Sequence, residues 1–346
     1  MRYTKLPNTD LNVSKICLGT MTFGRQNTET EGHEQLDFAI SKGVNFIDTA
    51  EMYAVPFIPE TQGLTEQYIG SWLAKNGNRE KVVLASKITG SGRGIFNCMR
   101  DNLDFSKTSL DDALHKSLNR LQTDYLDLYQ LHWPERTVNI FGVRDYNHAP
   151  NAQWEDNFSQ ILDRLETYVK EGKIRHIGLS NETPFGLMRY MEEHRKGKRK
   201  IVSVQNAYNL LQRRDEIGFT EALQMEDVGY LAYSPLAFGV LSGKYLNNEK
   251  PDDARVTLFP NYSRYSSESS ARATEKYSEI AKRHGLSLPQ MALAFVNQQP
   301  FVTSNIIGAT SIEQLSENID SIDVVLSEEI LKEINTVHAQ MPNPAP

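Results

Sequence analysis

The chain has 346 residues, of which 39% are hydrophobic and 23% are charged, an ordinary composition for a globular protein with a sizeable core. Lysine and arginine total 37 against 44 aspartate and glutamate residues, which gives a formal net charge of −7. Because no overall positive field would attract a polyanion, we expect no nucleic-acid partner and no binding to an anionic membrane.

Cysteine usage and hydropathy indicate the compartment and argue against a membrane-spanning segment. Cys17 and Cys98 stand far apart, with no CxxC spacing and no signal-like apolar run ahead of them, so a reducing cytoplasm is the expected compartment. No apolar run approaches the ~20 residues that a membrane-spanning helix needs. No cluster of histidine, cysteine and carboxylate side chains has metal-ligand spacing, so we expect no metal. The basic run at residues 194–200 is interpreted as a solvated helix end rather than a phosphate or RNA patch.

An N-terminal β-hairpin is the first predicted element, because Pro7, Asn8 and Asp10 separate two short apolar pieces between residues 3 and 16. Strand-like runs then alternate with helical patterns, and these runs are "SKICLGT", "NFIDTA", "KVVLASK", "YLDLYQLH", "KIRHIGLS", "IVSVQ", "VGYLAYSPL" and "SNIIGAT". Eight such units are typical of an α/β protein and predict one (β/α)8 TIM barrel domain over residues 1–346. A doubly wound sheet is the alternative, but the turn at residues 19–24 lacks the GxGxxG pattern.

The helical patterns carry apolar residues on one face, as packing against a sheet requires. They begin near Glu31, at Leu64, at Ser106 or Thr108, and near Phe158, and two of them end near Gly77 and Gly172. Three connections, at residues 54–63, 89–105 and 133–157, are longer than barrel loops need to be. Since sites on a barrel lie at the C-terminal ends of its strands, these loops are interpreted as walls of a binding site rather than as mobile decoration.

Titratable side chains gather at the expected C-terminal ends of three neighbouring strands. Asp48 ends the second strand and Tyr53 follows five residues later, while Lys87 ends the third strand and His132 the fourth. Each has an ordinary structural explanation: a loop cap, a packed phenol, a solvent-facing ammonium and a satisfied core histidine. Charged residues at the ends of apolar strands are, however, seldom buried without a partner, which favours a pair between Asp48 and Lys87.

Together the four side chains suit proton transfer to a carbonyl group. A phenol has a pKa of ~10, and a nearby ammonium is expected to make the Tyr53 proton easier to give up. Asp48 would hold Lys87 in place and charged, and a neutral His132 would donate a hydrogen bond to the substrate oxygen. The arrangement places a general acid beside a polarised carbonyl group, whose carbon can accept a hydride.

The order of these residues resembles the catalytic tetrad of the aldo-keto reductases, and the resemblance extends over nearly the whole chain. The segments that carry it are "LGTMTFG", "FIDTAEMY", "ASK", "LHWP", "IGLSN", "VQNAYNLL", "AYSPLAFGVLSGKY" and "IIGATSIEQLSENI". Oxidoreductases related to the voltage-gated potassium channel β-subunit are neighbouring relatives. The resemblance implies a barrel that holds NADPH or NADP+ across its C-terminal face, with Asp48, Tyr53, Lys87 and His132 as the tetrad.

The resemblance also implies the residues of the cofactor site. Ser180, Asn181 and Gln205 would meet the nicotinamide carboxamide, and Tyr233 would stack on the ring. The other implied cofactor residues are Gly19, Thr20, Met21 and Asp48; Ser234, Pro235, Leu236, Ala237 and Gly239 around the pyrophosphate, with Lys244 beside it; and Arg264, Gly308, Thr310, Gln314, Glu317 and Asn318 at the adenosine end. Lys244 and Arg264 favour NADPH over NADH, because a ribose 2′-phosphate suits a cationic fork. The alternative is that both are surface cations.

These observations predict an NADPH-dependent reductase that converts a small-molecule aldehyde or ketone to an alcohol, with Tyr53 as the general acid. An NADPH-binding regulatory or sensing subunit with weak or no turnover is the alternative, and a lyase that uses Lys87 as a Schiff base is a third reading. The substrate and the oligomeric state stay open. Aromatic residues of the long loops suit an apolar or aromatic carbonyl compound, and they are Phe57, Phe96, Trp133, Phe141 and Tyr146.

Overall fold

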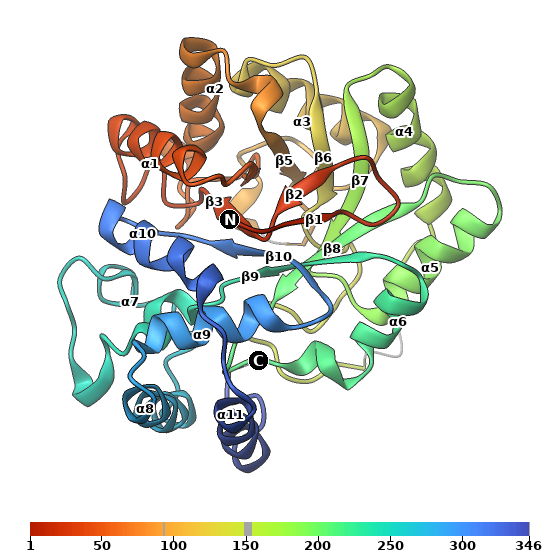
Figure 1. The fold of residues 1–346 in the computed structure, drawn as a ribbon. Coiled ribbons are helices and arrows are strands. Elements are labelled where there is room, and N and C mark those ends of the chain that lie inside the picture. The colour runs from red at the N-terminus through yellow and green to blue at the C-terminus, as the bar shows by residue number, and fades with distance from the viewer. Residues whose placement is uncertain (93, 149–153, 346) are drawn as a thin grey trace.

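The computed structural model describes residues 1–92, 94–148 and 154–345, and its centre is a closed barrel of eight parallel strands (Figure 1). The strands are β3 (Ile16–Gly19), β4 (Phe46–Asp48), β5 (Val83–Ile88), β6 (Leu126–Leu131), β7 (Ile174–Ser180), β8 (Ile201–Ala207), β9 (Gly229–Tyr233) and β10 (Val302–Ile307). They follow one another around the barrel in chain order, and β10 closes it against β3. The predicted (β/α)8 TIM barrel is confirmed.

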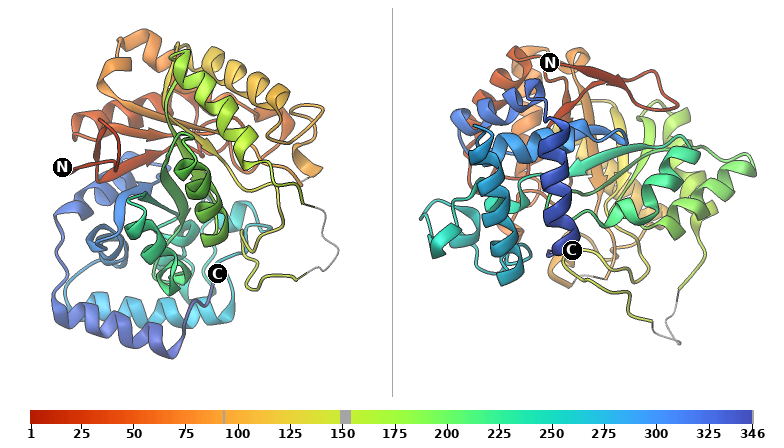
Figure 2. Two further views of the ribbon diagram at one scale, coloured as in Figure 1. Left: turned by 90° about the vertical axis from the view of Figure 1, so that its right-hand side faces the viewer. Right: turned by 60° about the horizontal axis from the view of Figure 1, so that its bottom comes forward.

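Helices form a ring outside the strands. They are α1 (Glu29–Ser41), α2 (Leu64–Asn76), α3 (Lys107–Leu121), α4 (Phe158–Lys170), α5 (Pro184–Arg195), α6 (Phe219–Met225), α7 (Arg255–Leu258), α8 (Glu268–Arg283), α9 (Leu288–Gln298), α10 (Ile312–Asp320) and α11 (Glu328–Gln340). Neighbouring helices pack from α1 to α6 and from α8 to α10, and α10 closes the ring against α1 (Figures 1 and 2). Among the described residues, no helix combines the length and apolar character that crossing a membrane requires.

Local sequence decides where these helices begin and end. The Thr28 hydroxyl accepts a hydrogen bond from the Glu31 backbone N–H, and the Glu31 carboxylate accepts one from the Thr28 N–H. This capping box starts α1 two residues before the predicted start. Ser106 caps α3, as predicted, and α5 ends at Arg195, so the basic run at residues 194–200 does lie at a helix end.

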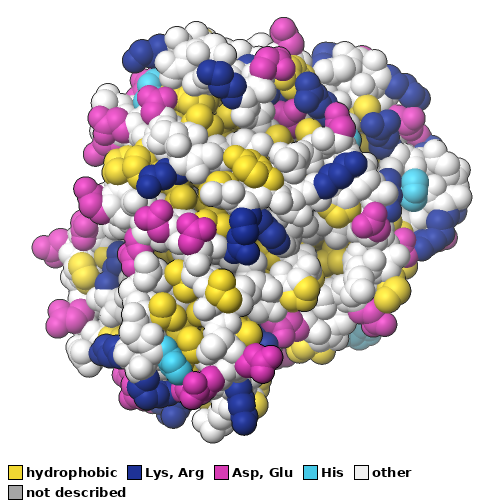
Figure 3. Space-filling model, viewed as in Figure 1, with side chains coloured by type: hydrophobic (Ala, Val, Ile, Leu, Met, Phe, Trp, Pro, Cys, Tyr) yellow, Lys and Arg dark blue, Asp and Glu magenta, His cyan; other side chains and the backbone are white. Residues whose placement is uncertain are grey.

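The N-terminal hairpin closes the end of the barrel where the strands begin (Figure 1). Its strands, β1 (Tyr3–Lys5) and β2 (Asn12–Ser14), pair in antiparallel fashion, as predicted. Leu6, Leu11 and Val13 are buried in one cluster with side chains from inside the barrel. Figure 3 views the molecule from this side and shows acidic and basic side chains interspersed over it. With this end closed, the open C-terminal face and its long loops are left for a site.

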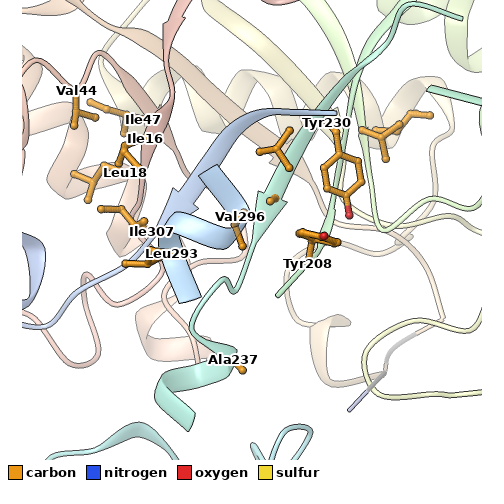
Figure 4. Packing of buried hydrophobic residues seen from close by; sticks show 14 of the residues in the cluster. Ile16, Leu18, Val44, Ile47, Tyr208, Tyr230, Ala237, Leu293, Val296 and Ile307 are labelled. Carbon is orange, nitrogen blue, oxygen red and sulfur yellow. The ribbon is translucent and has the colours of Figure 1, made fainter. Parts of the chain in front are cut away.

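The larger core lies between the strands and the helices. Successive strand residues point to opposite faces, so Ile16 and Leu18 of β3 pack outward while Cys17 points into the barrel. Figure 4 shows the outward-facing side chains of β3 beside Leu293 of α9. The same alternation directs the last residues of each strand either to the barrel axis or to the helices, and this sets which side chains can meet at the C-terminal face.

Candidate active site

The four titratable residues singled out in the sequence meet at the C-terminal face. Asp48 is the last residue of β4, Lys87 is the next-to-last residue of β5, and His132 directly follows β6. Lys87 Nζ lies 2.5 Å from Asp48 Oδ2, 2.8 Å from the Thr49 carbonyl oxygen and 3.4 Å from the Tyr53 hydroxyl. An ammonium has three N–H donors, so these three acceptors use all of them.

His132 lies on the other side of the phenol. Its ring centroid is 5.8 Å from that of Tyr53, at an interplanar angle of 74°. The backbone N–H of His132 donates to the Ile88 carbonyl, and the Asn181 amide donates to the His132 carbonyl at 2.8 Å. Hydrogen bonds from the two neighbouring segments therefore fix the backbone of His132.

Two glutamine side chains complete the surroundings of Asp48. Gln205 Nε2 donates to Asp48 Oδ1 at 2.8 Å, and Gln130 Nε2 donates to the same oxygen at 3.2 Å. Sequence reasoning identified Gln205 but missed Gln130. The signal was present, because Gln130 stands two residues before His132 in "YLDLYQLH" and a strand places alternate residues on one face.

Burial and two neighbouring charges set the pKa of Tyr53. Burial raises the pKa of Tyr53 above its ordinary value of 10.0, and the neighbouring charge of Lys87 lowers it only in part, while Asp48 raises it further. Burial alone would lower the pKa of Lys87, but the charge of Asp48, above all, leaves that pKa above 10.5. Lys87 therefore acts on the phenol in the predicted direction, but desolvation of the phenolate outweighs the ammonium and the net shift of the Tyr53 pKa is upward.

The residues implied for the nicotinamide end form one hydrogen-bonded group. The Tyr233 hydroxyl donates to Asn181 Oδ1 at 2.6 Å, and the Ser180 hydroxyl donates to the Gln205 carbonyl at 2.9 Å. Gln205 in turn reaches Asp48, so this group adjoins the tetrad directly. Thr20 also adjoins it, because its hydroxyl donates to the Asp48 carbonyl at 2.9 Å.

The residues implied for the rest of the cofactor occupy two further loops. Between β9 and Lys244 the backbone turns tightly, with positive φ at Ser234, Ala237, Phe238 and Gly239. Turns of this kind can direct successive backbone N–H groups at an anion. At the start of α10, Gln314 Oε1 accepts from the Thr310 N–H and the Asn318 amide donates to the Gly308 carbonyl. Glu317 Oε1 accepts a hydrogen bond from the Ser287 hydroxyl at 2.6 Å.

Arg264 lies beside Tyr233, the residue implied to stack on the nicotinamide. Its guanidinium hydrogen-bonds Gln212 Oε1 at 2.6 Å and also contacts the Tyr233 hydroxyl. Together with Tyr233 and Asn181 it lines a cavity of about 220 Å³. Its implied place at the adenosine end stays a prediction.

Arg255 is a cation that sequence reasoning missed. It lies on α7, donates from Nε to Gln26 Oε1 at 3.3 Å, and has Nη1 3.7 Å from Met21 Sδ. Its guanidinium carbon is 5.6 Å from the centroid of the Phe238 ring. Over the described part of the chain, no carboxylate lies within 4.0 Å of it, and burial lowers its pKa. Arg255 thus joins the loop after β3 to the loop after β9 and carries a charge that those loops do not balance.

Aromatic side chains surround the mouth of the site. Phe57 packs on Phe96 with 4.7 Å between ring centroids, Phe96 on Trp133 at 5.5 Å, and Trp133 on Phe141 at 5.7 Å. Tyr146, also predicted for this rim, is 61% exposed and lies outside this aromatic cluster. Residues 93 and 149–153 of the predicted loop walls lie outside the described residues. No group of three His, Cys, Asp or Glu side chains in the described ranges is placed to hold a metal ion.

Comparison with known proteins agrees with this geometry. The model of the Aldo/keto reductase family matches residues 15–339. Protein tas of Escherichia coli is 51% identical over 349 aligned positions that cover all of both chains. The uncharacterized oxidoreductase YrpG of Bacillus subtilis is 34% identical, covering 97% of this chain and 96% of its own. An aldo-keto reductase of Babesia bovis is 38% identical over 279 positions, 76% of this chain and 98% of its own.

Proposed function

Because the chain belongs to the aldo-keto reductase family of oxidoreductases, we propose that it is an NADPH-dependent reductase that converts an aldehyde or ketone to an alcohol. Members of this family generally use a nicotinamide dinucleotide and act on small carbonyl substrates. The observation that carries the proposal is the position of Lys87 Nζ between Asp48 and the Tyr53 hydroxyl. We infer that residues 1–346 act as one domain in this reaction.

The chain offers a set of groups that fits such a cofactor. Next to the tetrad lie the hydroxyl of Ser180 and the amides of Asn181 and Gln205, which would hydrogen-bond the nicotinamide carboxamide. Lys244 and the turns at residues 234–239 suit a pyrophosphate. Arg255 supplies the unbalanced cation, and a half-buried guanidinium without a carboxylate partner favours a bound anion. When bound, the cofactor would supply the hydride.

The residues of the chain handle the proton. His132 and Tyr53 lie side by side, so a carbonyl oxygen that reaches both would be oriented by His132 and protonated by Tyr53. The raised pKa keeps the Tyr53 phenol protonated at neutral pH, and a phenol is still far more acidic than an alcohol. After transfer, the phenolate would face the Lys87 ammonium at 3.4 Å, which stabilises the negative charge. Asp48 keeps that ammonium charged.

The aromatic mouth favours a substrate with an apolar or aromatic group. Phe57, Phe96, Trp133 and Phe141 offer ring faces and edges beside the tetrad. The Schiff-base reading has less support, since that chemistry needs a neutral amine and Lys87 is held charged by Asp48.

The test is NADPH oxidation, followed by nicotinamide absorbance, with wild type and Tyr53→Phe over a panel of aromatic and aliphatic aldehydes and dicarbonyls. Removing the proton donor is expected to lower kcat roughly 10²- to 10⁴-fold. NADPH affinity, measured by quenching of tryptophan fluorescence, is expected to stay within about twofold of wild type. The control is Tyr146→Phe, an exposed tyrosine outside the mouth, which should keep full activity.

A sensing subunit is the second candidate, because it would use the same cofactor residues beside Asp48. Tight NADPH binding without turnover on any carbonyl, in wild type and Tyr53→Phe alike, would support sensing and count against the reductase. Undiminished turnover by Tyr53→Phe would remove Tyr53 from the mechanism.

A further inference from the structure

A charged side chain with no role in the proposed mechanism lies inside the turn that joins two members of the tetrad. Glu51 stands three residues after Asp48 and two before Tyr53, and its side chain is only 2% exposed. Burial raises the pKa of this carboxyl, with Arg100 as the main opposing influence. A carboxylate in such a place needs partners, and its partners are the Thr89 backbone N–H and the Arg100 guanidinium.

The contacts of Glu51 tie the turn to the strand that carries Lys87. Its Oε1 accepts from the Thr89 backbone N–H at 2.6 Å, and its own backbone N–H donates to the Lys87 carbonyl at 3.2 Å. Its carbonyl accepts from Gln62 Nε2 at 2.5 Å, which adds the loop at residues 54–63. The segment between Asp48 and Tyr53 is thus held against the end of β5 at Lys87 and Thr89.

Arg100 supplies the third attachment. Its Nη2 forms an ion pair with Glu51 Oε2, and its Nε lies 3.8 Å from Asp112 Oδ2 on α3. The Arg100 side chain comes from the long connection at residues 89–105 and is 6% exposed. Its Nε and Nη1 atoms are buried without a hydrogen-bond partner. A buried ion pair with incomplete hydrogen bonding contributes little net stability compared with well-packed apolar side chains.

We propose that Glu51 and Arg100 are positioning residues that hold the Tyr53 hydroxyl within reach of Lys87 for proton transfer, an inference that rests on the proposed reductase function. The pair fixes the short turn from outside the tetrad and anchors the loop wall at residues 89–105 to it. Its role is geometric: it sets where the phenol stands relative to the ammonium. A loss of alignment of about 1 Å can lower a rate on the order of 10²-fold.

The chain provides a matched control at the opposite end of the same strand. Asp127 Oδ2 accepts from the Leu84 backbone N–H at 2.9 Å and from Arg79 Nη2 at 2.8 Å, and its side chain is 2% exposed. Like Glu51, Asp127 is a buried carboxylate that binds a backbone amide of the β5 segment and an arginine, and it also pairs with Arg175 Nη1 at 2.9 Å. It lies where the strands begin, away from the tetrad.

The experiment compares Glu51→Gln with Asp127→Asn in the full chain. Both substitutions are expected to lower the unfolding temperature, because each removes a buried carboxylate charge that faces an arginine. Only Glu51→Gln is expected to lower kcat, by roughly ten- to a hundredfold, with KM and NADPH affinity within about twofold of wild type. Equal effects of the two variants on kcat, or no effect of Glu51→Gln, would overturn the proposal.

A second measurement does not depend on turnover. The protein is labelled with fluorotyrosine, and among its 15 tyrosines the ¹⁹F resonance of Tyr53 is assigned by its loss in Tyr53→Phe. Glu51→Gln is expected to shift or broaden that resonance, and Asp127→Asn is expected to leave it in place. An unchanged Tyr53 resonance in Glu51→Gln would overturn the positioning role. If Glu51→Gln does not fold, Arg100→Lys, which keeps the charge but loses the planar fork, is expected to shift the same resonance to a smaller extent.

These two readouts separate the failure of this inference from the failure of the proposed function. If wild type reduces no carbonyl compound but the Tyr53 resonance still responds to Glu51→Gln alone, the reductase assignment fails and the positioning role stands. If wild type is an active reductase and neither kcat nor the resonance responds, the positioning role fails and the reductase stands.

Discussion

At the scale of single residues, Tyr53 illustrates how burial and charge compete over one hydroxyl. The ammonium of Lys87 at 3.4 Å favours the phenolate, but the phenol is removed from water and Asp48 lies on the far side of that ammonium. The ion pair presents a weaker field to Tyr53 than a lone lysine would, because the carboxylate offsets it. The sequence reveals which groups meet, but the sign of the net shift depends on how much water the fold excludes.

The raised pKa of Tyr53 determines the expected pH dependence of reduction. Tyr53 donates only while protonated, and its pKa is raised above 10.0, so we expect kcat/KM for a carbonyl substrate to be flat from about pH 7 to about pH 10 and to fall only above that range. Lys87, whose pKa is also raised, stays charged over the same interval. The profile is measured from initial rates of NADPH oxidation, with the residual rate of Tyr53→Phe as the baseline. A falling limb centred near pH 8 would mean that the charge of Lys87 outweighs burial.

Arg255 leads to a prediction about the cofactor. A guanidinium without a carboxylate partner is expected to bind a phosphate group, and a hydrogen bond to a charged group is worth about 1.5–3 kcal/mol. Arg255→Met should therefore weaken NADPH binding roughly ten- to a hundredfold, as measured by quenching of tryptophan fluorescence. Arg272→Met is the control, because Arg272 is 60% exposed and pairs only with Glu268 on the surface of α8. NADPH affinity unchanged in Arg255→Met would remove this residue from the cofactor site.

At the scale of elements, the strands were predictable and the loops were not. In β6 a run of apolar residues predicts a strand, and Gln130 and His132 on one face predict that its C-terminal end is polar. The meeting of Glu51 with Arg100 carried no such signal, since the connection at residues 89–105 has no periodicity and only tertiary packing determines where Arg100 points. Sequence patterns therefore located the tetrad, whereas the contacts that surround it required the fold.

Helix packing at Gly70 provides an element-scale prediction. On α2, a Cβ at this position would lie 2.1 Å from the Arg120 carbonyl oxygen of α3. Alanine is about 1 kcal/mol better than glycine within a helix, but the obstacle here is backbone that cannot move aside cheaply. Gly70→Ala is expected to destabilise the protein by about 1–3 kcal/mol in urea unfolding. Gln67→Ala, an exposed position on the same helix, should change stability by less than about 0.5 kcal/mol. A stabilised Gly70→Ala would show that the two helices can separate freely.

At the scale of the whole molecule, the site depends on closure at both ends of the barrel. The hairpin fills the end where the strands begin, and Lys15 Nζ donates to the Val302 carbonyl at the start of β10. At the other end, the last described residues join the loop after β8: the Arg213 N–H donates to Asn343 Oδ1 at 2.6 Å and the Ala345 N–H to the Leu211 carbonyl at 3.2 Å. Segments far apart in the chain thus hydrogen-bond to one another at both ends of the strands that carry the tetrad.

The substitution Leu6→Ala tests whether the hairpin and the barrel unfold as one cooperative unit. Its side chain is fully buried in the cluster that contains Phe46 and Leu128, so Leu6→Ala is expected to cost about 2–5 kcal/mol of unfolding free energy. If hairpin and barrel unfold together, the urea transitions followed by far-UV circular dichroism and by tryptophan fluorescence should stay coincident and move together to lower urea. Lys5→Ala, an exposed neighbour in β1, should leave both in place. A barrel transition that does not move in Leu6→Ala would mean that the hairpin docks as a separate unit, and the barrel with its tetrad would then be stable without it.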